Sequence, residues 1–265
     1  MAEETPKRHW KALSNTFWRV RIRAGHCRRE LRKEAGSVPA KGMNIEVRDL
    51  FDLSATIAAE LLAGKRYPWE ALPELREFIR ALGASLPESE YRRAGEDVWI
   101  ARDAVVAPTA CLNGPLIVDH GAELRHCAFV RGSAIVGKGA VVGNSTELKN
   151  CILFDGAQAP HFNYVGDAIL GARAHMGAGA VTSNVRSDKR NVVVHAETDL
   201  PTGLRKLGAM LGDRAEVGCN SVLNPGTVVG RDAIVYPASC VRGVIPANHI
   251  FKGVGAPVAR REEAR

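Results

Sequence analysis

The sequence predicts a mainly β protein, a left-handed parallel β-helix made of hexapeptide repeats and preceded by short N-terminal helices. Three observations predict it. Aliphatic residues recur every six positions from Ile100 to Leu148, and the position four beyond each is usually small, as at Ala104. The same rule returns from Leu211 to Val241. A helix or a flat strand does not give a period of six.

A three-sided coil explains this period. Each hexapeptide forms one short strand and one corner, so every sixth residue points to the axis and a small residue fits the corner. Three hexapeptides make an 18-residue coil, and successive coils stack as parallel strands about 4.8 Å apart. The sides are too short for crossover helices, so the right-handed crossover rule does not apply.

The repeat is expected to continue through Phe154 and Pro160 and then to slip, with five-residue steps before Thr182. It stops between about Asn184 and Leu211. Residues 195–210 are predicted to be an insertion that leaves the coil and is helical after Pro201. Irregular segments in a rigid repeat often carry function.

Residues 43–97 are predicted to be helical. Ser54 is expected to cap a helix over residues 55–63 that ends at Gly64. Pro68 is expected in the first turn of a second helix, over residues 69–82, that ends at Gly83. Both helices are expected to pack on one end of the β-helix.

The excess positive charge lies in one segment. The chain has 36 Lys and Arg and 29 Asp and Glu, a net charge of +7, and residues 1–42 hold 11 of the former and 4 of the latter. The remaining residues balance to zero. Residues 1–42 are therefore expected to be a disordered basic extension, the alternative being an arm for an acidic partner. Residues 98–250 form the predicted β-helix and residues 251–265 a C-terminal tail.

Composition argues against several classes of protein. No apolar run has the roughly 20 residues of a membrane helix, and the N-terminal MAEETPKRHWK has no apolar segment of a signal peptide. The six cysteines form no CxxC or CxxH pair. We therefore expect a cytoplasmic protein with no nucleic-acid or membrane partner.

Arg131 and Lys149 are 18 positions apart, so adjacent coils should stack them on one side. Two unpaired cations about 5 Å apart repel each other. Either both side chains turn into solvent or Glu147 neutralises one of them, or the two together clamp a phosphate. The spacing alone leaves these alternatives open.

His161 is the candidate general base, because imidazole titrates near neutral pH. It follows Lys149 by 12 positions, so it should lie on another side of the coil. A neighbouring chain in an oligomer would bring the two together. The alternative is an ordinary corner histidine. Asn163, Tyr164 and Asp167 are candidates for orienting His161 or the substrate.

The repeat does not group histidines into a metal site, so no metal is expected. His120 and His126 fall on different sides, and His161, His175 and His195 have no regular spacing. Cys219 is expected to be a small buried thiol rather than a nucleophile.

The stretches VGNSTELKN and PHFNYVGDAILGARAHMGAGAVTSN, within residues 142–184, resemble the acetyltransferase domain of bifunctional N-acetylglucosamine-1-phosphate uridyltransferase/glucosamine-1-phosphate acetyltransferase. The specific match spans residues 131–194, and looser similarity spans 98–250. The family's nucleotidyltransferase domain has no counterpart in the chain, so nucleotidyl transfer is not expected.

This resemblance implies residue roles. It implies that His161 is the catalytic base and that Arg131, Lys149, Tyr164 and Asn184 bind the sugar phosphate. It also implies a homotrimer with each site between subunits. Three further positions fall in the family's site: His175 and Lys189 toward the substrate, and Cys219 near acetyl-CoA.

The chain departs from the family pattern at several positions. His175 replaces an asparagine, Val185 a tyrosine and Cys219 a serine, while Lys189 matches a family lysine only approximately. The insertion at residues 197–210 has no counterpart. These departures leave the sugar and the acyl donor open.

The expected function is acyl transfer from acetyl-CoA or another acyl-CoA, used as a co-substrate, to an amino-sugar phosphate or a nucleotide-linked amino sugar. No tightly bound cofactor is expected. Backbone N–H groups near Gly177–Gly179 are expected to stabilise the oxyanion. The alternatives are a non-catalytic scaffold trimer that binds sugar nucleotides and a metal-dependent hydratase of the γ-carbonic-anhydrase type.

Overall fold

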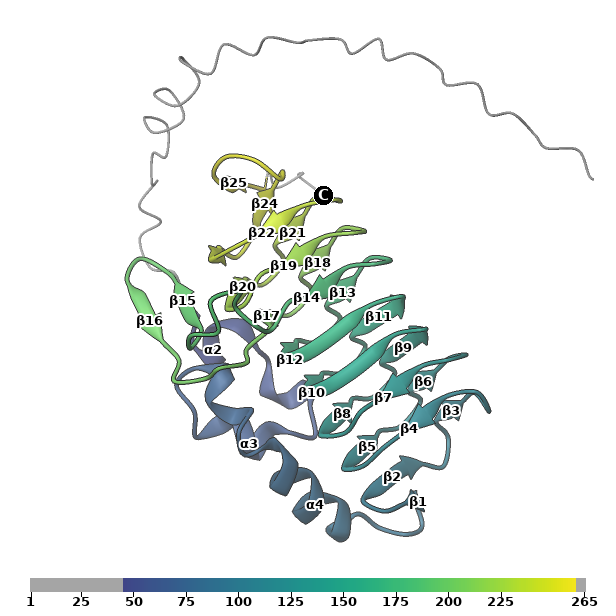
Figure 1. Cartoon of the computed structure of the whole chain (residues 1–265). Helices are drawn as coiled ribbons and strands as arrows, with labels where there is room; N and C mark the ends of the chain where they lie inside the picture. The colour runs from purple at the N-terminus through teal and green to yellow at the C-terminus, as the bar shows by residue number, and fades with distance from the viewer. Residues whose placement is uncertain (1–44, 261–265) are drawn as a thin grey trace, which may run out of the picture. The chain divides into compact units, whose positions relative to one another are not determined.

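The computed structural model describes residues 45–260, which wind into a stack of three-sided coils with helices packed along one side (Figure 1). The predicted extension, residues 1–42, lies outside the described residues. The parallel β-helix predicted from the hexapeptides is confirmed, because the strands of successive coils pair in parallel along all three faces.

The strands form three faces. Face 1 contains β3 (Val105–Val106), β6 (Glu123–Leu124), β9 (Val141–Asn144), β11 (Gln158–His161), β13 (His175–Met176), β18 (Glu216–Val217), β21 (Ile234–Val235) and β24 (His249–Phe251). Face 2 contains β4 (Cys111–Leu112), β7 (Phe129–Val130), the first halves of β10 (Glu147–Leu153) and β12 (Tyr164–Leu170), β14 (Val181–Thr182), β19 (Val222–Leu223) and β22 (Cys240–Val241). Face 3 contains β2 (Val98–Ala101), β5 (Leu116–Val118), β8 (Ala134–Val136), the second halves of β10 and β12, β17 (Ala209–Leu211), β20 (Thr227–Val229) and β23 (Val244–Ile245).

Antiparallel strands close the two ends of the stack. β1 (Tyr91–Gly95) pairs with β2 at the first coil. β25 (Val258–Ala259) pairs with β24 at the last coil, within the segment predicted to be a tail.

The axis of the stack is one continuous apolar core. The predicted inward positions from Ile100 to Leu148 and from Leu211 to Val241 all belong to it or pack against it. Small residues lie at the corners as expected, and Ser221 and Thr227 are fully buried there. Branched aliphatic side chains fill the narrow axis without the voids that destabilise a core.

The predicted register at Phe154 and Pro160 is wrong by one residue. Leu153, not Phe154, points to the axis, because the coil that pairs Ala134 with Cys151 has 17 residues. Phe154 instead points outward and its ring lies 5.0 Å from that of Phe51. The first five-residue step therefore comes two sides earlier than predicted, and it places an aromatic ring where the helices can cover it.

The N-terminal helices are shorter than predicted and pack along face 3 rather than on an end (Figure 1). They are α2 (Val47–Leu50), α3 (Ala59–Ala63) and α4 (Leu75–Ser85), with 3₁₀ turns η1 (Leu53–Ala55) and η2 (Pro68–Ala71). They cover a row of outward isoleucines on face 3: Ile117, Ile135, Ile152 and Ile169.

The predicted helix boundaries are correct only in part. Gly64 does cap α3, but Ser54 caps no helix; its N–H instead donates to Asp52 Oδ1, 3.0 Å away, at the start of η1. Gly83 lies inside α4 instead of ending it. The ring of Trp99 packs directly against its Cα, so the position needs a residue without a side chain.

We expect Gly83→Ala to destabilise the protein by about 1–3 kcal/mol, because the new methyl group overlaps the Trp99 ring. Helix propensity alone predicts the opposite sign, a gain of about 1 kcal/mol. Urea unfolding of the two proteins decides between them. A more stable variant would show that Trp99 does not occupy this space.

The insertion is a β-hairpin, so the prediction of a helix after Pro201 is wrong. The chain leaves the coil after Ser183, and Gly208 rejoins it by donating to Asp167 O. β15 (Val193–His195) pairs antiparallel with β16 (Asp199–Pro201). Val192 and Val194 are buried in the apolar cluster that contains the helix side chains, while Val193 between them is half-buried, and this alternation is typical of a strand.

Candidate active site

Arg131 and Lys149 lie side by side on the outer surface of face 2. β7 pairs with β10 so that Val130 lies opposite Leu148, and the next residues along are Arg131 and Lys149. The stacking predicted from their spacing is confirmed.

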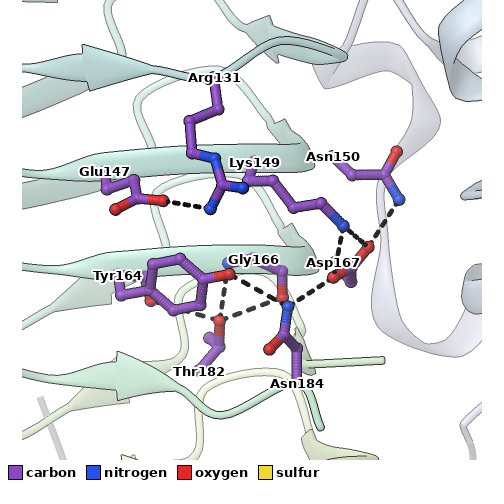
Figure 2. A network of polar contacts seen from close by, with 9 residues as sticks. All are labelled: Arg131, Glu147, Lys149, Asn150, Tyr164, Gly166, Asp167, Thr182 and Asn184. Carbon is purple, nitrogen blue, oxygen red and sulfur yellow. Dashed lines mark hydrogen bonds and ion pairs between the residues drawn. The ribbon is translucent and has the colours of Figure 1, made fainter. Parts of the chain in front are cut away.

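A carboxylate neutralises each of these cations (Figure 2). Arg131 Nη1 donates to Glu147 Oε1 at 2.9 Å. Lys149 Nζ donates to both oxygens of Asp167, at 2.7 and 2.9 Å. The repulsion between the cations is thereby relieved, and the local charge of these four groups sums to zero.

Asp167 is the centre of this network. Its side chain is only 4% exposed, and it also accepts from Asn150 Nδ2 at 2.9 Å and from Asn184 Nδ2 at 2.6 Å. Asn150, Asp167 and Asn184 are spaced by 17 residues, so they occupy the same corner of successive coils. Asn150 was not among the residues predicted from the sequence, although this spacing from Asp167 could have identified it.

Tyr164 completes the network on the side nearer His161. Asn184 Nδ2 donates to its hydroxyl oxygen at 3.1 Å. Burial, together with the nearby negative charge of Asp167, raises the pKa of Tyr164. The hydroxyl therefore stays protonated near neutral pH and can donate a hydrogen bond to a ligand.

His161 lies at the end of β11, at the edge where face 1 meets face 2, so the prediction that it occupies another side from Lys149 is confirmed. Its ring is exposed and makes no side-chain hydrogen bond within residues 45–260. Asn163 stabilises this corner through its side chain. Its Oδ1 accepts from the His161 N–H at 3.0 Å, and its Nδ2 donates to the carbonyls of Gly177 and Ala180. Asn163 therefore holds the backbone rather than the imidazole.

The structure gathers only some of the predicted site residues. Arg131, Lys149, Tyr164 and Asn184 form one network, with His161 at the adjoining edge. His175 lies on face 1, where its Nδ1 is 2.9 Å from Glu216 Oε2.

Lys189 and Cys219 lie outside the network. Lys189 is exposed in the insertion, which leaves the coil between faces 2 and 3. Cys219 is exposed too, so the expectation that it is buried is wrong. The ladder of backbone hydrogen bonds places it two coils beyond His161 on the same edge, about 10 Å away.

Within the stretch predicted to stabilise the oxyanion, the N–H of Ala178 makes no hydrogen bond to residues 45–260, whereas those of Gly177 and Gly179 do. They donate to Val217 O at 2.7 Å and to His161 O at 3.0 Å. Both bonds belong to the stacking of successive coils, so neither group is available to a ligand.

Residues 45–260 contain no group of three or more His, Cys, Asp or Glu side chains arranged to hold a metal ion. None of their helices has the length and apolarity needed to span a bilayer.

Known proteins resemble this chain in sequence. No family model matches it. It is 32% identical over 191 residues to the bifunctional protein GlmU of Methanococcus maripaludis, a match that covers 70% of this chain and 46% of the relative. It is 31% identical over 126 residues to the bifunctional sugar-1-phosphate nucleotidylyltransferase/acetyltransferase of Sulfurisphaera tokodaii, covering 47% of this chain and 31% of the relative. The chain is a homologue of part of these bifunctional proteins. It spans less than half the length of either relative.

Solved structures give a weaker likeness. A perosamine N-acetyltransferase from Caulobacter crescentus, a mutant in complex with CoA and GDP-perosamine, is 19% identical. That match covers 58% of this chain and 51% of the other, with a TM-score of 0.28. A superposition this poor transfers no residue roles within the hexapeptide-repeat family.

Proposed function

We propose that the protein is an acyl-CoA-dependent N-acyltransferase that acts on a phosphorylated amino sugar, free or nucleotide-linked. The observation that carries the proposal is the convergence of Arg131, Lys149, Tyr164 and Asn184 on one open face, next to the exposed imidazole of His161. The homology to bifunctional acetyltransferases supports the same reaction class.

The two cations bind the substrate phosphate. Lys149 keeps one N–H beyond the two given to Asp167, and Arg131 keeps the donors that do not reach Glu147. Together they fix the phosphate, and Tyr164 donates to the sugar. Fixing both ends of the sugar places its amine against the acyl group, which lowers the entropy cost of the reaction.

His161 takes the proton. The amine nitrogen attacks the thioester carbonyl, a C–N bond forms and the amine proton passes to the imidazole. The C–S bond then breaks, and the leaving CoA thiolate takes that proton back. This series of steps needs no covalent enzyme intermediate.

We propose that the site is completed in a homotrimer. His161 lies on the edge and Lys149 on the adjoining face, so an edge of one protomer can pack against face 2 of the next. Cys219, on the same edge as His161, then lies beside the acyl donor. In this trimer, His175 and Lys189 contact the ligand that a neighbouring protomer binds.

The direct test measures thiol release from acetyl-CoA with glucosamine-1-phosphate and with galactosamine-1-phosphate. The proposal expects saturable release that depends on the sugar's phosphate. One observation favours a scaffold instead: carboxylates already neutralise both cations. Binding of a nucleotide sugar without any thiol release would support the scaffold and end the transferase proposal.

We expect Arg131→Met to raise the KM for the sugar phosphate about tenfold to a hundredfold while kcat changes little, because a charge-assisted hydrogen bond to phosphate is lost. Steady-state kinetics at saturating acetyl-CoA measure it. Arg125→Met is the matched control, since Arg125 makes the same kind of ion pair, with Glu123 at 2.9 Å, on face 1. Equal effects in the two variants would contradict a phosphate role for Arg131.

A further inference from the structure

The insertion, residues 184–207, helps to form a polar pocket directly beside the network. Ser183 and Val185, which flank Asn184, line a cavity of about 300 Å³. Its other walls include His195 of β15 and Arg242, the residue after β22. The proposed mechanism uses none of the residues that line it.

A chain of hydrogen bonds orients Arg242 at this pocket. Arg242 Nη2 lies 2.8 Å from His195 Nε2, and His195 Nδ1 lies 2.8 Å from Asp199 Oδ1. A guanidinium can only donate, so Nε2 of His195 accepts and its proton is on Nδ1, toward Asp199. Within residues 45–260, Arg242 is therefore held by a ring nitrogen and has no carboxylate in direct contact.

The carboxylates at the pocket are already occupied. Asp188 accepts from Arg186 Nε at 3.0 Å and from Arg186 Nη2 at 2.7 Å, while Asp199 faces His195. The hydroxyl of Ser183 makes no hydrogen bond to residues 45–260. The lining thus holds two arginines against one aspartate, and this positive charge favours an anionic ligand.

Strand register places the pocket on the same outward row as Lys149. Lys149 lies opposite Gly166, and the row continues through Ser183 to Arg242. Two coils separate Lys149 from Ser183, a distance of about 10 Å. The phosphate of a sugar monophosphate held by Arg131 and Lys149 cannot fill both places, so an anion bound in the pocket is a separate group.

We propose that this pocket binds a phosphoryl group of one of the two acyl-transfer ligands, separate from the phosphate at Arg131 and Lys149. Two ligands carry such a group: the acyl-CoA, through its 3′-phosphate, and a nucleotide-linked sugar, through its diphosphate. The assignment rests on the proposed function for the identity of these ligands. The hairpin that supplies His195 and Asp199 makes the pocket a feature of this chain.

Calorimetric titration of the full chain with CoA, 3′-dephospho-CoA, UDP and uridine tests the proposal. We expect Arg242→Gln to weaken binding of CoA or of UDP about tenfold, because a charge-assisted hydrogen bond is lost. Loss confined to CoA, with dephospho-CoA unaffected, identifies the 3′-phosphate; loss confined to UDP, with uridine unaffected, identifies the diphosphate. Arg205→Gln is the matched control. Arg205 is an exposed arginine of the same insertion and does not line the pocket.

Two results would overturn the proposal: unchanged binding of both CoA and UDP by Arg242→Gln, or equal weakening by Arg205→Gln. Ser183→Ala, which removes one donor and no charge, should weaken the same ligand to a smaller degree. The titrations measure binding without turnover. If thiol release fails but the Arg242-dependent binding persists, the pocket stands and the transferase proposal falls; the reverse pattern removes only the pocket.

Discussion

Replacing His161 with glutamine is expected to lower kcat for acyl transfer about 10²–10⁴-fold, the usual contribution of a general base. Because the imidazole is exposed and its ring bonds to nothing in residues 45–260, the fold does not depend on it. The KM values should therefore change little. The loss should appear in single-turnover measurements as well as in the steady state.

His249→Gln is a suitable control for this variant. His249 lies in β24, in the last coil, and its ring contacts the Ala247 carbonyl at 2.8 Å. It should retain full activity. If His161→Gln keeps wild-type turnover, another group accepts the proton and the assignment of His161 is wrong.

Removing the carboxylate of Asp167 is expected to cost about 3 kcal/mol in the free energy of unfolding. Asp167 is almost fully buried and accepts from Lys149, Asn150 and Asn184, so Asp167→Ala leaves a cation and two amides without their partner. Breaking a buried ion pair costs about 3–5 kcal/mol, and we take the lower end because Lys149 is partly exposed and can turn to solvent.

Denaturant unfolding of Asp167→Ala, Asp167→Asn and Asp232→Ala measures this cost. Asp167→Asn keeps the shape and one acceptor, so it should lose less than the alanine variant. Asp232 pairs with the half-exposed Arg214 at 2.8 Å, and its removal should cost about 1 kcal/mol or less. A loss at Asp167 no larger than that at Asp232 would show that the network does not organise face 2.

The period of six made most of the β-helix predictable. It identifies the inward residues of the regular coils, and an 18-residue coil correctly stacks Arg131 on Lys149. Period alone could not show the 17-residue coil that turns Phe154 outward, because a phenylalanine in register fits an apolar pattern on either side of the strand. The ring of Phe51, 103 positions earlier, decides its direction.

Tertiary contacts decided the other differences. Gly83 is a normal helix terminator in sequence, but in the fold it provides space for Trp99. The insertion around Pro201 contains no repeat from which its structure could be predicted. It forms strands because Val192 and Val194 are buried against other segments. Asp167 was foreseen only as an orienting group, since its role depends on Asn150 and Asn184 in neighbouring coils.

The positions of His161 and Lys149 on adjoining sides of the coil underlie the proposal of a site shared between protomers. At sugar-phosphate concentrations well below KM, each single variant, His161→Gln and Lys149→Met, should have little activity alone. In oligomers that contain both, a neighbour can supply the missing group.

The most direct test is the thiol-release rate of the two variants co-expressed at equal amounts, with mixed oligomers verified by tandem affinity tags. If each site takes His161 from one protomer and Lys149 from the next, random mixing restores about a quarter of wild-type activity per site. If the mixed oligomers are as inactive as the separate variants, His161 and Lys149 do not meet across an interface, and the proposed shared site is contradicted.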